Sequence, residues 1–322
     1  MKGLMTHIIL LMALILVIRP VNLVAQPSGN EMQYLINPSF LAPVLFEDGD
    51  RFLGFYTYRT DWTGFSGHPE EHYLDISGII HQKMLLGGQI QYVTADIFRY
   101  FYFSLRYALK IRIAENHRLT LGIDGVFFNT IVDLTGAVVY DPMDPLINGK
   151  ERISQVGFNI GAGLGYQLKT FSFCLYSPML LNNRSEYDQA VETTHLTLPR
   201  NLFIYLSNDF LIVRKWLIKP AFLVKMTSDA PTVMELSVIG GLADHFWLGM
   251  LYRTNKTMGI TAGVEFWDRL LFSYGYEFFT GSTPGVHTGT HEITLGLKIS
   301  NPKVVTPELK DYFTTPVSNP SK

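Results

Sequence analysis

The stretch "VGFNIGAGLGY", residues 156–166, places apolar side chains on one parity and four glycines with Asn159 on the other. Successive side chains of a strand point to opposite faces, so the stretch is expected to be a β-strand with one apolar face and one nearly bare face. A strand of a soluble sandwich usually carries long polar side chains on its second face. Glycines instead suit a face that bends sharply or looks into a crowded interior, such as the inner wall of a barrel.

The same alternation recurs along the chain. In residues 101–111 the odd positions are apolar, whereas Ser104, Arg106 and Lys110 occupy even positions. Fourteen such segments can be counted, and segments of this length match the roughly 9–11 residues that a tilted strand needs to cross a bilayer. An even number of strands brings both termini to the same side of the membrane. The segments are 51–61, 70–81, 84–95, 100–113, 118–128, 152–168, 170–181, 197–209, 214–228, 232–243, 245–254, 256–267, 268–280 and 289–300.

The connections between these segments sort by length. Outer-membrane barrels have short periplasmic turns and longer outer loops, with both termini in the periplasm. Every even-numbered connection should therefore be short, and each of them is, including "FLIV" at 210–213. The long connections 129–151, 182–196 and 281–288 are all odd-numbered. This sorting favours a transmembrane antiparallel β-barrel over a soluble sandwich.

Two features leave the strand count open at twelve, fourteen or sixteen. Pro220 falls in the middle of the ninth segment, where it removes a ladder hydrogen bond, so a bulge or a shifted boundary is expected there. The second and eighth segments also alternate poorly.

The N-terminus has the layout of a secretory signal peptide. Lys2 precedes the apolar run "IILLMALILVI", which stops at Arg19 and Pro20. Residues 1–25 are therefore expected to be removed by cleavage after Ala25. The alternative is an uncleaved membrane anchor, although the apolar run is short for a span.

Composition supports a membrane protein. Charged residues make up only 17% of the 322 residues, against roughly 25% in an average soluble domain. Beyond residue 26 no stretch approaches the ~20 apolar residues of a transmembrane helix, and a closed barrel is the other structure that satisfies every backbone group in lipid. The sequence thus predicts a signal peptide (1–25), a periplasmic or plug-like N-terminal segment (26–50), an outer-membrane barrel (51–300) and a short periplasmic tail (301–322).

No pattern of residues predicts an enzyme. Ser66 and His68 in "GFSGH" lack the spacing and the strand-to-helix context that expose a nucleophile. Cys174 is a single cysteine inside a strand pattern, and it is expected to be a buried structural thiol.

No pattern predicts a cofactor, a metal or a nucleic acid ligand either. On a strand, His287 and His291 would lie ~13 Å apart, too far to share a metal. Asp141 and Asp144 lie in the longest predicted outer loop, where a calcium site is possible but Asp-Pro steps more often shape a turn. The formal net charge of −2, which becomes −4 without Lys2 and Arg19, gives no indication of nucleic acid binding.

The segment "RTDWTGFSGHPEEHYLDISG", residues 59–78, combines turn-forming residues with two large apolar side chains, Trp62 and Phe65. These side chains would lie near the outer boundary of the membrane. They could anchor the barrel as part of an aromatic belt, or they could dock a partner.

At this segment the chain resembles the PorP/SprF family of outer-membrane proteins from the type IX secretion and gliding-motility systems of the Bacteroidetes. The family opens with an Asn-Pro stretch, here "QYLINPSFLAP" (33–43), followed by an Arg-x-x-Trp-x-Gly-Phe-x-Gly-x-Pro motif, here "RTDWTGFSGHP" (59–69). Two departures are Ala42 where a second Asn-Pro step is usual and Asp61 before the tryptophan. The residues that match, and that are candidates for docking, are Asn37, Pro38, Arg59, Trp62, Gly64, Phe65, Gly67 and Pro69.

The resemblance implies a non-enzymatic outer-membrane component that helps to secrete or anchor surface proteins by protein–protein docking. Its implied partners are other type IX secretion subunits, a large secreted surface protein or adhesin, and outer-membrane lipid. The alternative is a passive channel, either a porin or a transporter of hydrophobic solutes. Charged residues of both signs occupy positions expected to face the lumen, where they could pair into a plug or line a pore. These residues are Arg106, Lys110, Asp124, Glu235, Glu265 and Glu277.

Overall fold

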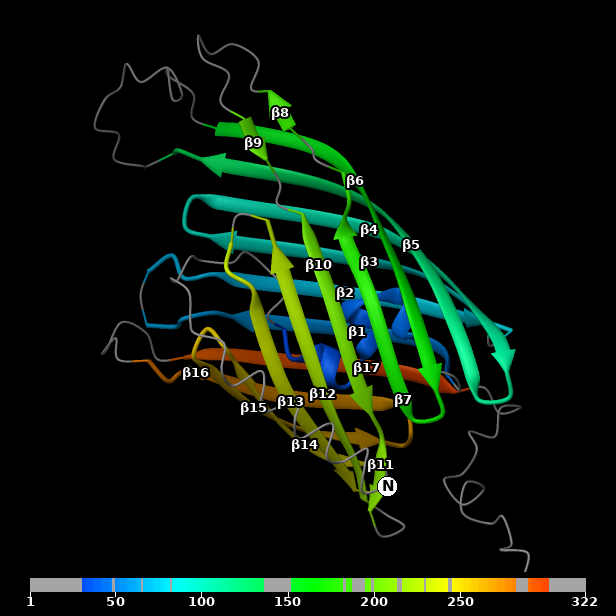
Figure 1. Ribbon diagram of the computed structural model, residues 1–322. Helices are drawn as coiled ribbons and strands as arrows, with labels where there is room; N and C mark the ends of the chain where they lie inside the picture. The colour runs from blue at the N-terminus through cyan, green and yellow to red at the C-terminus, as the bar shows by residue number, and fades with distance from the viewer. Residues whose placement is uncertain are drawn as a thin grey trace, which may run out of the picture.

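Fourteen antiparallel strands form the wall of a closed barrel (Figure 1). The computed structural model describes residues 31–47, 50–64, 66–81, 83–135, 152–181, 184–186, 195–197, 200–212, 216–228, 230–242, 245–281 and 289–300. The strands of the wall are β1 (Asp50–Thr60), β2 (Glu70–Ile80), β3 (Met84–Ala95), β4 (Phe98–Ala114), β5 (His117–Asp133), β6 (Arg152–Leu168), β7 (Phe171–Met179), β10 (Asn201–Asn208), β12 (Trp216–Thr227), β13 (Val233–Leu242), β14 (Phe246–Arg253), β15 (Thr257–Phe266), β16 (Leu270–Phe279) and β17 (Thr290–Ser300).

Neighbouring strands of the wall follow one another along the chain. The ring closes where β1 pairs with β17, and β10 links β7 to β12. β8 (Arg184–Glu186) and β9 (His195–Thr197) form a separate two-stranded sheet. Among the described residues no helix is long and apolar enough to cross a membrane. We call the end where β1 begins and β17 ends the terminal end, and the opposite end the loop end.

Each predicted segment corresponds to one strand of the wall, so the predicted barrel and its strand count are confirmed. One predicted turn is wrong in part. Residues 210–213 were expected to be a turn, but Phe210–Ile212 form a short strand, β11, that pairs with the start of β12.

Pro220 explains why β10 and β11 are separate. The expected bulge is absent from the β12–β13 ladder, where Pro220 lies opposite Val238 in continuous register. On its other side, the β10–β12 ladder stops at Ser207 and resumes in the same register at Phe210. Because proline has no N–H to donate, the interruption falls in the neighbouring strand directly opposite it.

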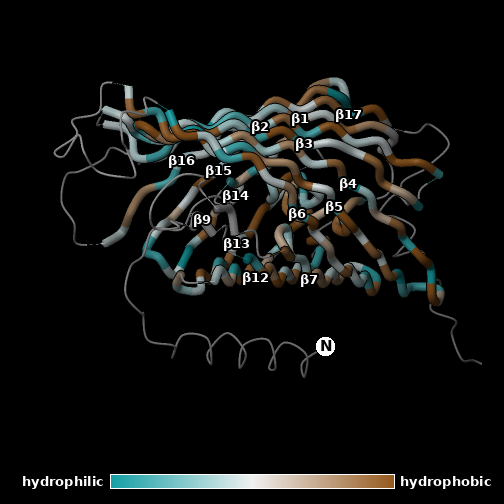
Figure 2. The backbone as a smooth tube through the Cα atoms, turned by 90° about the horizontal axis from the view of Figure 1, so that it is seen from above, coloured by the Kyte–Doolittle hydropathy of each residue, from teal (hydrophilic) through white to brown (hydrophobic). Residues whose placement is uncertain are grey.

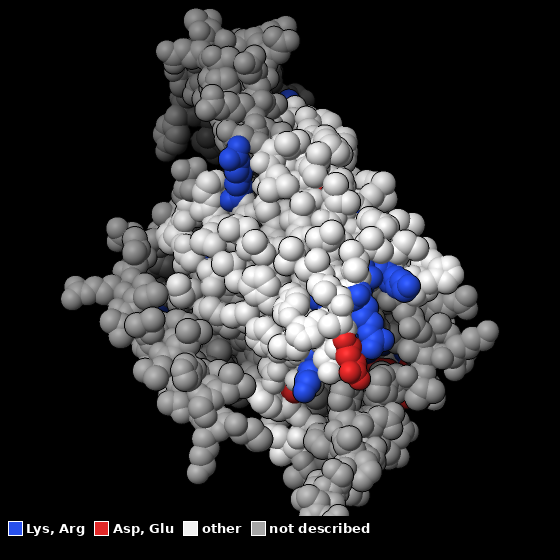
Figure 3. Space-filling view, turned by 45° about the vertical axis from the view of Figure 1, so that its right-hand side comes forward, with Lys and Arg blue, Asp and Glu red and all other residues white. Residues whose placement is uncertain are grey.

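The outer face of the wall is apolar and the inner face is mixed. Hydrophobic and hydrophilic residues alternate along the strands in Figure 2, and in β6 the outward Val156 and Phe158 are 58% and 54% exposed while Asn159 is fully buried. Charged side chains are few on the face in Figure 3, and most of them gather at one edge of it. Such an outer face suits lipid, because unpaired charges are costly in the hydrocarbon region.

Residues 31–47, which we call the N-terminal segment, lie inside the barrel as the blue turns in Figure 1. The segment consists of η1 (Gln33–Leu35), α2 (Pro38–Leu41) and η2 (Pro43–Leu45). Asn37 precedes α2, and Pro38 and Pro43 begin the two following helices, where a missing N–H costs nothing. Nearly every residue of the segment is buried, so the segment fills the lumen as a core would.

The glycines of β6 are explained by what lies against them. A Cβ on Gly165 would lie 2.8 Å from the carbonyl oxygen of Val44 in the N-terminal segment, and one on Gly161 would lie 3.0 Å from the carbonyl oxygen of Pro178. On the neighbouring strand β5, a Cβ on Gly122 would lie 2.6 Å from Cγ1 of Val44. On the bare face of "VGFNIGAGLGY", Gly165 therefore leaves room for the segment that crosses the lumen, and the other glycines leave room for residues of β5 and β7.

We expect Gly165→Ala to lower the stability of the barrel by about 1–3 kcal/mol, because the new methyl group meets backbone rather than a movable side-chain end. The matched control is Gly125→Ala in β5, whose Cβ would make only an ordinary 3.6 Å contact with the ring of Phe158. Urea unfolding in detergent, followed by tryptophan fluorescence, measures both variants. Equal stability of the two variants would contradict this account of Gly165.

Candidate functional site in the barrel lumen

A buried network of charges lies in the loop-end half of the lumen. Arg59 of β1 makes ion pairs with Glu277 of β16 at 3.0 Å and with Glu292 of β17 at 3.1 Å. Arg253 of β14 pairs with Glu277 at 2.8 Å and also with Glu235 of β13. The side chains of this network are at most 4% exposed. Two arginines thus connect strands from β13 round to β1 across the inner wall.

The beginning of the N-terminal segment is hydrogen-bonded to the same network. The backbone N–H of Met32 donates to Glu292 at 2.8 Å, and the hydroxyl of Tyr34 donates to Glu235. Thr57 of β1 donates to the side-chain oxygen of Gln33 at 2.7 Å. These bonds fix the segment at the loop-end half of the lumen, where its backbone and side chains find partners in place of water.

The middle of the segment is held by Arg106 of β4. Its guanidinium donates to Asp75 of β2 at 2.7 Å and to the backbone carbonyls of Ser39 and Phe40. These carbonyls belong to a helix of one turn, so they have no full set of partners within the helix. A buried arginine with a carboxylate on one side and two carbonyls on the other satisfies most of its donors.

The end of the segment is held at the terminal end of the barrel. The ammonium of Lys110 donates to the carbonyl of Phe46 at 3.0 Å and lies 4.1 Å from the centre of the Phe46 ring. Lys219 of β12 pairs with Glu47 at 2.8 Å and lies 3.6 Å from Asp209. The Lys219 ammonium lowers the pKa of Glu47. The segment therefore crosses the lumen from the loop-end half to the terminal end, with polar contacts at both ends and in the middle.

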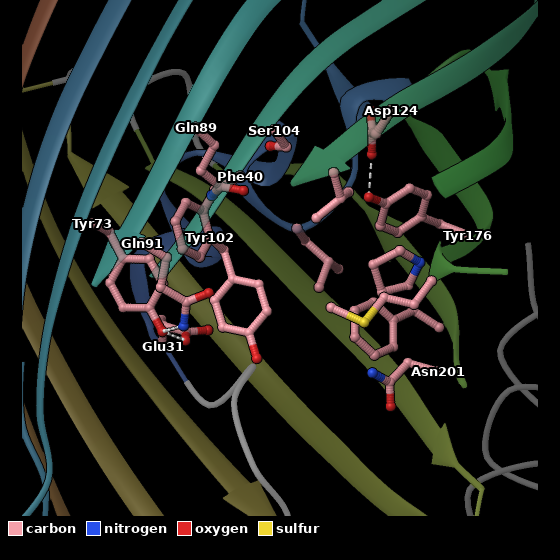
Figure 4. Close-up of a pocket in the computed structure, with 15 residues that line it drawn as sticks. Glu31, Phe40, Tyr73, Gln89, Gln91, Tyr102, Ser104, Asp124, Tyr176 and Asn201 are labelled. Carbon is pink, nitrogen blue, oxygen red and sulfur yellow. Dashed lines mark hydrogen bonds between the residues drawn. The ribbon is translucent and has the colours of Figure 1, made fainter. Parts of the chain in front are cut away.

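Two hollows in the described part of the lumen lie against different parts of the segment. The loop-end hollow, of about 130 Å³, is lined by residues of the segment, β2–β5, β7 and β10 (Figure 4). The terminal-end hollow, of about 210 Å³, is lined by other residues of the segment, β4–β7, β10 and β12 together with Asp209. Phe40 and Tyr176 line the first, whereas Val44 and Tyr205 line the second. All four belong to one buried apolar cluster, with Met32, Tyr34, Leu35, Ala42, Leu45, Tyr73, Cys174, Ala221, Leu223 and Leu251.

The sequence model of the family described as "Type IX secretion system membrane protein PorP/SprF" matches residues 24–297. This match covers most of the chain. The chain belongs to the PorP/SprF family. The resemblance inferred from the sequence is thus confirmed. The protein is a membrane component of the type IX secretion system, and this implies other subunits of that system as partners. No curated protein matches its sequence.

Solved structures of outer-membrane barrels are similar to this PorP/SprF protein in fold. The CymD monoaromatic hydrocarbon channel has a TM-score of 0.51 at 12% identity, over 86% of this chain and 95% of that chain. The toluene transporter TodX of P. putida has a TM-score of 0.49 at 9% identity, over 80% and 91%. Omp33 of Acinetobacter baumannii has a TM-score of 0.47 at 7% identity, over 79% and 99%. Membership of this family agrees with the predicted location in the outer membrane.

The family motif of the PorP/SprF protein is split between the lumen and the loop end. Asn37 and Pro38 are buried in the N-terminal segment, and Arg59 is 2% exposed in the charge network. Arg59 also pairs with Asp61 at 2.8 Å, so the residue that departs from the family pattern serves as a partner of the motif arginine.

The rest of the motif forms the connection from β1 to β2. Trp62 is 47% exposed and has a positive φ of 50°. Gly64 and Gly67 have φ values of 115° and 78°, which side chains with a Cβ rarely adopt. The N–H of Asp61 donates to the carbonyl of Pro69 at 2.8 Å and closes the connection at its base. Phe65 lies outside the described residues.

Several other residues that the sequence singled out can be placed. His68 is hydrogen-bonded to Thr60 at 3.2 Å, and Ser66 is exposed. His291 faces outward against the hydroxyl of Tyr274 at 2.7 Å, and Cys174 is a buried free thiol. Asp141, Asp144 and His287 lie outside the described residues, as do residues 1–25 of the predicted signal peptide.

All six charged residues predicted to face inward lie on the inner side of the wall. Glu265 is paired there with Lys298 at 3.0 Å, and the others are buried. Sequence reasoning did not single out Asp75, Arg253 and Glu292. The parity of Asp75 and Glu292 within β2 and β17 was the signal available for them, because both alternate with outward apolar residues.

Proposed function

We propose that this protein is a non-enzymatic docking component that helps the type IX secretion system to secrete or anchor large surface proteins, rather than a channel for solutes. The observation that supports this is the N-terminal segment, which crosses the lumen and separates its two hollows with a buried apolar cluster. A barrel whose interior is occupied in this way offers its two ends, rather than a continuous pore, for function.

In this proposal the loop end faces outward and the terminal end faces the periplasm. Outer-membrane barrels place their short turns in the periplasm, and the turns at the terminal end are short, such as residues 115–116 and 169–170. Cargo would contact the Trp62–Pro69 connection and the predicted outer loops 129–151 and 182–196. The structure corrects the bounds of both loops, because residues 129–133 belong to β5, and β8 and the start of β9 lie within 182–196. Other secretion subunits would contact the periplasmic turns and the termini.

Site-specific crosslinking tests the docking role. The chain has a single cysteine, Cys174, which is buried, so a new surface cysteine can be labelled selectively with a photo-crosslinker. We expect Trp62→Cys to capture a large surface protein in cells. The matched control is Trp267→Cys in the β15–β16 turn at the terminal end, where the side chain is 79% exposed. Capture of the same surface protein from both positions, or from neither, would contradict docking at the loop end.

A passive channel is the second candidate. The specific observation in its favour is the pair of hollows at opposite ends of the lumen, both lined by β4, β5, β7 and β10. CymD and TodX, which share the fold, are named for hydrocarbon transport. We expect the purified protein to show negligible conductance in planar bilayers. Steady conductance of the unmodified protein would favour the channel instead.

A further inference from the structure

The loop-end hollow is walled by aromatic rings and bounded by polar groups, as Figure 4 shows. Its aromatic side chains come from the segment and from four strands, and its polar groups include two amides from β3. A volume of about 130 Å³ is close to that of an engineered cavity of about 150 Å³ that holds benzene. The hollow therefore has room for one ring or for the end of one long side chain. The aromatic residues are Phe40, Tyr73, Tyr102, Tyr176 and Phe203.

The charges that line this hollow are all negative. Glu31 and Asp124 supply a carboxyl group each, and the lining residues include no lysine, arginine or histidine. The terminal-end hollow differs, because Lys110, Arg118 and Lys219 line it. Aromatic faces also carry partial negative charge, so they add to the attraction for a cation.

Asp124 has an unused acceptor. Its side chain is 2% exposed, and one carboxyl oxygen accepts a hydrogen bond from the Tyr176 hydroxyl. The other oxygen, Oδ1, is buried and has no hydrogen-bond partner among the described residues. Leaving a buried carboxylate oxygen without a donor is costly, and each such group calls for an explanation. Arg106 lies opposite Asp124 in the β4–β5 ladder and acts on it electrostatically, but it donates no hydrogen bond to Oδ1. A ligand that brings an N–H donor would supply what this oxygen lacks.

We propose that the loop-end hollow is a binding site for an organic cation, an amine or a guanidinium, whose charge lies at Asp124 and whose carbon skeleton lies against Tyr102 and Phe203. Two sources carry this chemistry, namely a lysine or arginine side chain of a polypeptide and a free amine. The proposal does not depend on the docking role of the loops, because a cation site can exist in either a docking component or a channel.

Benzamidine and benzamide are a matched pair of probes for this site. They have nearly the same shape, but only benzamidine is charged and carries donors on both nitrogens. Isothermal titration of the purified, folded barrel in detergent should show benzamidine binding at least about tenfold tighter than benzamide, as expected for a charge-assisted hydrogen bond. Equal affinity for the two probes, or no binding of benzamidine, would overturn the proposal.

The variant Asp124→Asn tests the residue that carries the proposal. Asparagine keeps an oxygen that can accept from Tyr176, so the fold should survive while benzamidine affinity falls by about tenfold or more. The matched control is Asp209→Asn. Asp209 also has a buried Oδ1 without a hydrogen-bond partner among the described residues, although the Lys219 ammonium lies 3.6 Å from it, and it lines the terminal-end hollow. An equal loss in both variants would overturn the assignment.

A second variant keeps the test decisive if Asp124→Asn does not fold. Tyr102→Leu removes an aromatic face without touching the charge network, and we expect it to weaken benzamidine by roughly tenfold or less. Unchanged affinity in this folded variant would overturn the placement of the ring. Displacement of benzamidine distinguishes the sources: Nα-acetyl-arginine methylamide mimics a side chain in a polypeptide, whereas spermidine represents a free amine. The competitor that displaces benzamidine at the lower concentration identifies the source.

Discussion

Replacing Arg253 by methionine is expected to lower the free energy of unfolding by about 3–5 kcal/mol, the usual cost of removing one partner from a buried ion pair. Arg253 is 1% exposed and lies between Glu235 and Glu277. Methionine fills a similar volume, so the loss would come from two buried carboxylates that lose their shared cation. Glu277 keeps Arg59 as a partner, whereas among the described residues Glu235 keeps the hydroxyl of Tyr34 but no cation at ion-pair distance.

The measurement is urea unfolding of the purified barrel in detergent, with the heat-dependent shift in gel mobility as a check that each variant folds. The matched control is Arg99→Met in β4. Arg99 pairs with Asp133 at 2.7 Å, but its side chain is 44% exposed, so the loss should be within about 1 kcal/mol. Adding Glu235→Gln to Arg253→Met should recover part of the stability, because it removes the unpaired charge. Similar losses for Arg253→Met and Arg99→Met would show that the network does not stabilise the lumen.

The strands could be predicted from the sequence because lipid imposes one rule on the whole outer wall. Each strand must present apolar side chains outward, so apolar residues recur at every second position even where the residues of the inner face vary. In β6, for example, Val156 and Phe158 face outward and Asn159 faces the lumen. Where the inner residues are also apolar, the contrast disappears. In β14 the inward Trp247 and Leu251 precede Arg253, and the alternation gives no reason to single out that arginine.

The path of the N-terminal segment could not be predicted, for a different reason. Its helices have three or four residues each, too short for any periodic pattern. Its partners also lie far away in the sequence, since Tyr34 meets Glu235 and Met32 meets Glu292. Only closure of the barrel brings these residues together. The glycine-rich face of β6 indicated a crowded interior, but it could not indicate which residues crowd it.

Removal of the N-terminal segment is expected to open the lumen to ions. Replacing residues 31–47 by a glycine-serine sequence of the same length should give the barrel a steady conductance in planar bilayers, where the unmodified protein is expected to show almost none. The replacement removes Phe40 and Val44, which line opposite hollows and belong to the apolar cluster that separates them. It also removes the backbone carbonyls to which Arg106 and Lys110 donate, so donors on both side chains become available to water and ions in the lumen.

The matched control replaces residues 303–319, an equally long stretch outside the described part of the chain, and it should leave the barrel sealed. The gel-mobility shift confirms that the replaced barrel is folded before any current is interpreted. Because Arg106 keeps Asp75 and Arg59 keeps Glu277 and Glu292, the wall retains most of its charge pairs without the segment. A folded barrel should therefore survive the change. If that folded barrel stays closed to ions, the segment is not what closes the lumen, and side chains of the wall itself must do so.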